Sequence, residues 1–128
     1  MPYLQLDLPG RFESGVKRDL AARLGALYAE AMQTRPSMVN VGFRELGPDN
    51  LYRCDEDGPT PVVMVMCDVR RGRPADQRLR LAEGIMAACT ETFGIPAEQV
   101  VIEFTQHAAD EMYRSTGWGT EWDAAEAT

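Results

Sequence analysis

The residue with the most distinctive chemistry in this sequence is Pro2, which directly follows the initiator methionine. Removal of Met1 would leave Pro2 with a free secondary amine, and such an amine can accept and return a proton. An ordinary α-amino group titrates at about pH 7.7 to 8.0, and burial beside cationic side chains would lower its pKa. We therefore expect a neutral amine at working pH, able to act as a general base or acid.

A group of arginines is the second candidate for chemistry. Five of the 13 basic residues fall within eleven positions: Arg70, Arg71, Arg73, Arg78 and Arg80. The first three follow a predicted strand, where guanidinium and backbone N–H groups could converge on one anion, ideally a carboxylate. The alternative is that they pair with surface acids, as we expect for the last two. In either case we do not expect an arginine at a strand end to belong to the core.

Composition and charge limit the possible partners. The chain is expected to form one domain, 1–128, with 45% hydrophobic and 26% charged residues, as is usual for globular proteins. A net charge of −7 argues against nucleic acid and anionic membranes as partners. No run has the length of a membrane span, and the first residues lack a signal-peptide pattern. We expect a cytoplasmic protein whose partner is a small molecule.

The cysteines and the single histidine give no sign of a metal or cofactor. Cys54, Cys67 and Cys89 are odd in number and widely spaced, which predicts reduced thiols. His107 has no cysteine or carboxylate cluster at ligand spacing around it, so we interpret it as a loop residue. No metal site and no cofactor are expected.

An internal repeat would position these groups, since each half is predicted to form a strand, a helix and a strand. In the first half, apolar residues alternate over 3–8 and again over 38–46, around a helix from about 13 to 32. The buried stripe of this helix is expected to consist of Val16, Leu20, Leu24, Leu27 and Ala31.

The second half repeats this order. Residues 62–69 are nearly all apolar, as in a central strand covered on both faces, and a helix over about 74–93 and a strand over 99–104 follow. Residues 47–60 carry turn formers throughout and predict an exposed connector. The aromatic residues after 110 need cover, either on a neighbouring subunit, as a lid over the Pro2 pocket, or on the chain's own sheet.

Two βαβ units, about 2–46 and 61–104, followed by a tail over 105–128, predict an α+β fold of two layers. A four-stranded mixed sheet would carry both helices on one face and leave its other face bare. Because the central strand is apolar on both sides, a second copy of the chain is the simplest cover for that face.

In combination, the N-terminal proline on a βαβ strand, the repeated unit and the turn from Arg70 to Arg73 resemble the tautomerase superfamily. The resemblance runs from Pro2 to about Phe104 and is to the members with fused βαβ units, such as the cis-3-chloroacrylic acid dehalogenase group and malonate semialdehyde decarboxylase. It implies that Pro2 is the catalytic base or acid. It also implies a homotrimer whose sheets pack around a central axis, where they would bury Val63 and Val65.

The resemblance also suggests which residues bind substrate. Arg70 and Arg73 match the pair that holds the substrate carboxylate in the dehalogenase group, whereas Arg71 and Arg73 match the spacing in malonate semialdehyde decarboxylase. Tyr28 falls where the dehalogenase group has a histidine that binds and polarises the substrate. Alternatively, Tyr28 belongs to the core, because it lies beside the buried stripe of its helix.

Two positions depart from the dehalogenase pattern. Glu103 stands where that group has a tyrosine, and Arg114 stands where it has a glutamate that activates water. Glu103 either contacts the substrate as a different base or faces solvent. These departures argue against hydration chemistry.

The reaction implied by the resemblance is cofactor-independent tautomerisation of a small 2-oxo acid or its enol, with proton transfer at Pro2. A second possibility is hydration, dehalogenation or decarboxylation of a small unsaturated or 3-oxo acid on the same scaffold. A third is a non-catalytic trimeric binding protein, in which Pro2 has no chemical role. A retained Met1 would favour this third possibility, because it would leave no free proline amine.

Overall fold

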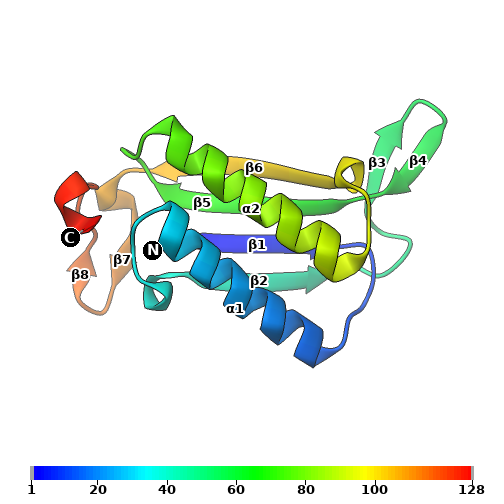
Figure 1. Cartoon of the computed structure of the whole chain (residues 1–128), viewed down its shortest axis with the longest axis horizontal. Coiled ribbons are helices and arrows are strands. Elements are labelled where there is room, and N and C mark those ends of the chain that lie inside the picture. The colour runs from blue at the N-terminus through cyan, green and yellow to red at the C-terminus, as the bar shows by residue number, and fades with distance from the viewer. Residues whose placement is uncertain (1, 128) are drawn as a thin grey trace.

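Alternating apolar residues build one mixed sheet of four strands. They are β1 (Tyr3–Leu8), β2 (Asn40–Glu45), β5 (Val63–Arg70) and β6 (Val100–His107), in the order β2-β1-β5-β6. The pairs β1–β2 and β5–β6 are parallel, whereas β1 and β5 are antiparallel. The computed structural model describes residues 2–127, and it confirms the predicted mixed sheet with two helices on one face (Figure 1).

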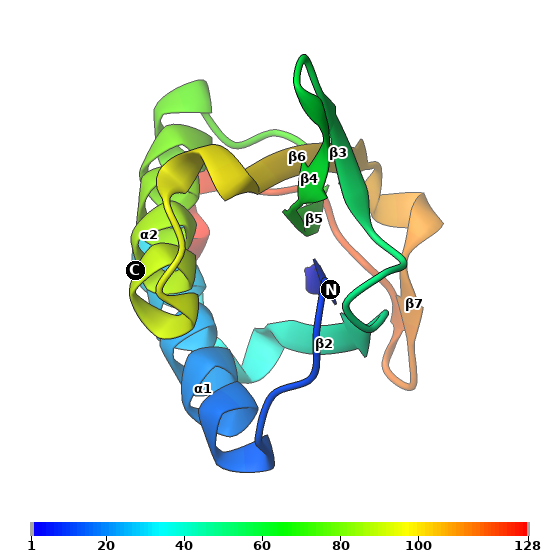
Figure 2. The same cartoon turned by 90° about the vertical axis from the view of Figure 1, so that its right-hand side faces the viewer.

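Helices α1 (Ser14–Ala31) and α2 (Ala75–Phe93) lie side by side on one face of the sheet, as Figure 2 shows from the end. Their buried residues pack with the inward-facing residues of β1 and β5 in one core: Leu20, Leu24, Leu81, Ile85, Leu4, Leu6, Val63 and Val65. Among the described residues, neither helix has an apolar stretch long enough to cross a bilayer.

The prediction for Val16 is wrong, because this side chain is 38% exposed. In the first turn of α1 it is Lys17 that reaches β2, where its Nζ lies 2.7 Å from Oε1 of Glu45. The buried stripe of the helix therefore starts one turn later, at Leu20.

The predicted connector over 47–60 contains a β-hairpin, so that prediction is only partly correct. Strands β3 (Tyr52–Asp55) and β4 (Gly58–Pro61) pair antiparallel, with Asp55 opposite Gly58. Gly58 has a φ of 115°, which favours glycine at the end of this tight turn. The hairpin projects from one end of the molecule, away from both termini (Figure 1). The tail after β6 adds the short strands β7 (Tyr113–Arg114) and β8 (Gly117–Trp118).

The central strand β5 is not apolar on both faces in the way we expected. Val63 and Val65 are 2% and 0% exposed and face the helices, so they cannot also form an interface between subunits. The outward face of β5 carries Met64 and Met66, both half-buried, followed by Asp68. The face that a second copy would cover is therefore partly polar.

Strand direction brings distant parts of the sequence to one edge of the sheet. Because β1 and β5 are antiparallel, Tyr3 pairs with Asp68, and Pro2 therefore lies near the end of β5 at Arg70. Helix α1 runs back along β1, so its last turn, with Tyr28, reaches the same edge. The first and the last residues that the structure describes also lie at this end of the molecule (Figure 1).

Candidate functional site

A cavity of about 410 Å³ lies at this edge of the sheet. Four of the six predicted site residues line it, namely Pro2, Tyr28, Arg70 and Arg73. The other lining residues come from the loop after α1 and from the tail: Thr34, Met38, Met112, Arg114, Thr116, Trp118, Gly119, Thr120 and Glu126. The cavity thus joins a proline, three arginines and a phenol with an apolar wall.

Pro2 is fixed at the cavity by the first residue of β2. The backbone N–H of Asn40 donates to the Pro2 carbonyl at 3.1 Å, and Nδ2 of Asn40 donates to the same oxygen at 3.3 Å. These bonds hold the proline from its carbonyl side, which leaves the nitrogen outside the ladder of β1 and β2.

Tyr28 combines both roles that the sequence left open. Its side chain is 0% exposed and belongs to the core cluster, yet it also lines the cavity. The hydroxyl has no hydrogen-bond partner among residues 2–127. Burial raises the Tyr28 pKa to about 12, against a smaller lowering by Arg73. Tyr28 is therefore a neutral hydrogen-bond donor without an acceptor, as a site for a ligand oxygen would need.

Replacement of Tyr28 by Phe separates these two roles. Because the buried hydroxyl is unpaired, we expect Tyr28→Phe to leave the free energy of unfolding unchanged or raise it by up to about 1 kcal/mol. If the cavity carries out the proton transfer expected from the sequence, turnover should fall about 10²-fold, since one donor to a developing oxyanion would be lost. Urea unfolding and steady-state kinetics on the same preparation measure both effects. A destabilised variant with full activity would contradict the assignment.

Arg73 is buried, contrary to our expectation for an arginine at a strand end. The residue is only 7% exposed, and its Nε donates to the Met32 carbonyl at 2.9 Å. Its Cζ lies 5.8 Å from the ring centroid of Trp122. Burial lowers the Arg73 pKa, because desolvation disfavours the charged form. The preceding Gly72 has a φ of 113°, a conformation that lets the chain turn sharply into α2.

Arg70 also lines the cavity, but the tail already occupies its guanidinium. Nη1 donates to the Thr120 carbonyl and Nη2 to Oε2 of Glu126, both at 2.6 Å. Arg71 is exposed, does not line the cavity and binds Glu121 at 3.3 Å.

Glu103 is not brought to this cavity. It is exposed on β6 and pairs in register with Met66, on the sheet face away from the helices. His107 is the last residue of β6 rather than a loop residue, and its Nε2 lies 3.6 Å from Oδ1 of Asp68. Strand β6 is longer than predicted because Thr105 to His107 continue the pairing with β5.

Sequence reasoning missed Thr120 and Glu126, which sit on Arg70. The tail has no hydrophobic period, so nothing in its pattern placed it over the arginine turn. The sequence did contain one signal, which was opposite charge. The tail carries Glu121, Asp123 and Glu126 close together, and the arginine turn could attract this acidic group.

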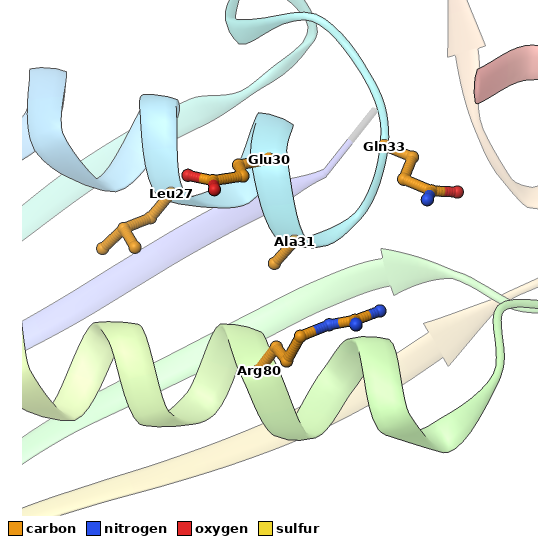
Figure 3. Close-up of a pocket in the computed structure, with 5 residues that line it drawn as sticks. All are labelled: Leu27, Glu30, Ala31, Gln33 and Arg80. Atoms are coloured by element: carbon orange, nitrogen blue, oxygen red, sulfur yellow. The ribbon is translucent and has the colours of Figure 1, made fainter. Parts of the chain in front are cut away.

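A second hollow, of about 380 Å³, lies between the two helices (Figure 3). Leu27, Glu30 and Ala31 of α1 and Arg80 of α2 line it, together with Gln33. It contains none of the predicted site residues. Within residues 2–127, no three His, Cys, Asp or Glu side chains come together as metal ligands.

No known family model matches the sequence, and no curated protein matches it either. Solved structures do match its fold. A crystal structure of Pt0534 inactivated by 2-oxo-3-pentynoate has a TM-score of 0.80 and 22% identity, over 91% of this chain and 94% of that chain. A crystal structure of N1, a member of the cis-3-chloroacrylic acid dehalogenase family, has a TM-score of 0.81 and 20% identity, over 93% and 84%.

The chain has the tautomerase fold. A third structure, the fused 4-OT protein Q0, is a symmetric trimer with a TM-score of 0.81 and 15% identity, over 91% of this chain and 94% of that chain. The resemblance that the sequence suggested is therefore confirmed at the level of the tautomerase fold. In this chain the cavity lies where the fold brings Pro2 beside the end of β5.

Proposed function

We propose that this protein is a cofactor-independent tautomerase of a small 2-oxo acid or its enol, with Pro2 as the proton carrier. The observation that supports this most is the convergence of Pro2, Tyr28, Arg70 and Arg73 on one cavity from three separate parts of the sequence. Each residue type supplies one group that the reaction needs: Pro2 a base, Tyr28 a hydrogen-bond donor to the substrate oxygen, and the two arginines positive charge.

In the proposed reaction Arg73 holds the substrate carboxylate, because its guanidinium is desolvated and has no carboxylate partner among residues 2–127. Tyr28 donates a hydrogen bond to the oxygen at C2. Starting from the enol, the neutral Pro2 amine accepts the hydroxyl proton and then delivers a proton to C3. The O–H bond breaks and its electron pair becomes the second bond of the C2 carbonyl, while the C=C electron pair forms the new C3–H bond with the proton from Pro2.

Electrostatics favours this proton transfer. Negative charge develops on the C2 oxygen in the transition state, where the Tyr28 hydroxyl and the positive charge of Arg73 stabilise it. The arginines that line the cavity also disfavour protonation of the Pro2 amine, because they place positive charge in the same cavity. This favours the neutral amine at working pH.

Hydration and dehalogenation fit the cavity less well. Glu126 is the only carboxylate among the described residues that line it, and this group is already bound to Arg70 at 2.6 Å. Arg114 lines the cavity where the dehalogenase pattern implies a glutamate. No free carboxylate in the described part of the cavity wall is therefore available to activate water.

The test is a substrate screen with protein whose mass confirms the loss of Met1. We expect ketonisation of the enol of phenylpyruvate or of 2-hydroxymuconate, followed by ultraviolet absorbance, and no halide release from 3-haloacrylates. Absence of turnover on every 2-oxo acid by protein with a free Pro2 amine would support the binding-protein alternative. Halide release would instead support the dehalogenase alternative.

We also propose a homotrimer. On the outward face of the sheet Met64 and Met66 are half-buried and pair in register with Asp7 and Gln5. The Q0 protein, whose fold is similar, is a symmetric trimer. Light scattering at micromolar concentration should give three times the mass of the chain. A monodisperse monomer would contradict this proposal.

A further inference from the structure

The arginine turn contacts the C-terminal part of the chain at several points. We call residues 118–126 the strap. Arg70 binds the Thr120 carbonyl and the Glu126 carboxylate, Arg71 binds Glu121, and the Arg73 guanidinium lies over the Trp122 ring. The residues expected to bind a substrate carboxylate are thus in contact with the protein's own tail.

The two arginines that line the cavity differ in their partners. Arg70 has a side chain 16% exposed and an ion pair with Glu126, whose side chain is 37% exposed. Arg73 makes its one side-chain hydrogen bond among residues 2–127 with a backbone carbonyl. Of the two arginines predicted to bind the substrate carboxylate, Arg70 is therefore already bound to a carboxylate of the chain itself.

We propose that Glu126 occupies the place of the substrate carboxylate on Arg70, so that the strap and the substrate compete for this arginine. This inference rests on the proposed function of the cavity. A charge-assisted bond of this length between guanidinium and carboxylate is strong, and both groups line the cavity. A substrate that binds both arginines must first displace Glu126.

Competition of this kind weakens binding in a defined way. While Glu126 is on Arg70, an incoming carboxylate finds only Arg73 and the Tyr28 hydroxyl. The apparent dissociation constant equals the intrinsic constant divided by the fraction of molecules in which Arg70 is not bound to Glu126. If Glu126 competes with the substrate, removal of its charge should improve the binding of a carboxylate. If Glu126 only stabilises the cavity wall, the same change should weaken that binding.

The experiment compares Glu126→Gln and Glu126→Ala with the unaltered chain, using 3-phenylpropanoate as the probe. This monocarboxylate has no 2-oxo group and is not turned over, so calorimetry reports binding alone. We expect both variants to bind it about 5- to 10-fold more tightly. The KM for the enol of phenylpyruvate should fall by a similar factor, with little change in kcat.

Two controls separate competition from other effects of a lost charge. Glu121→Gln removes an acid from the same strap, but its partners, Arg71 and the backbone N–H of Ala109, do not line the cavity, so binding should not change. In an Arg70→Gln background, Glu126→Gln should no longer tighten binding, because the two residues act through one contact.

Unchanged or weaker binding in both Glu126 variants would overturn the inference and make Glu126 an anchor of the cavity wall. Tighter binding that persists in the Arg70→Gln background would overturn it too, because the effect would not act through Arg70. Since the probe is not a substrate, the titration decides this point even if no 2-oxo acid is turned over. Failure of the substrate screen would instead count against the proposed function.

Discussion

Protein with a free Pro2 amine is expected to lose at least about 10²-fold in turnover when that amine is blocked by residues fused ahead of it. The reason is that an amide nitrogen cannot accept a proton, while the rest of the cavity is unchanged. Pro2→Ala should lose most activity as well, because a primary amine has a different basicity and geometry. Ketonisation rates, with the mass of each N-terminus, check both results.

The pH profile provides an independent test of the same amine. The arginines that line the same cavity as Pro2 disfavour its charged form, so the active neutral form should persist to lower pH than in an ordinary α-amine. Turnover should rise with pH through an apparent pKa below about 7.7. Tyr28 should not limit the rate at high pH, since its pKa of about 12 keeps the hydroxyl protonated. If a blocked chain turned over as fast as the processed one, another base would be required.

Replacement of Arg73 by Ala is expected to affect both binding and stability. The variant would leave the buried Met32 carbonyl without its donor and remove the packing on Trp122. We expect a loss of about 2 kcal/mol in the free energy of unfolding. For carboxylate substrates, kcat/KM should fall by about 10²-fold, because the desolvated cation of the cavity is lost.

Arg71→Ala is the matched control for Arg73. It removes an exposed guanidinium from the same turn, and its ion pair with Glu121 should contribute at most about 1 kcal/mol. Arg73→Lys keeps the charge and should recover part of the binding without restoring the bond to Met32. Urea unfolding and carboxylate binding measure all three variants. Full stability in Arg73→Ala would show that the Met32 contact has no structural role.

The regular part of the fold could be predicted because its signals are local. Leu4, Leu6 and Leu8 alternate and are all buried, and the two long helices end close to where the periodicity ends. The hairpin was missed because Pro59 and Pro61 argue against a strand. A two-stranded ribbon tolerates them, since prolines fit where the N–H is not needed for pairing.

The site could be predicted only as far as those regular elements position it. Pro2 directly precedes β1, Arg70 and Arg73 lie at the end of β5 and in the turn after it, and Tyr28 lies in the last turn of α1, so the directions of these elements bring them together. The burial of Arg73 could not be foreseen, because it depends on Met32 and Trp122. Both contacts join segments far apart in sequence, and the tail has no period that would reveal its path.

Because β1 and β5 are antiparallel, the turn after each of these two strands lies at a different end of the sheet. Their matching turns, Gly10-Arg11 and Gly72-Arg73, lie at opposite ends of the sheet, and only the second turn borders the cavity. The first and the last described residues also lie at the cavity end (Figure 1). An affinity tag or a fused domain at either terminus would therefore sit beside the reacting groups. Sequence inserted in the turn at 56–57, at the tip of the β3–β4 hairpin, would instead lie at the far end of the molecule.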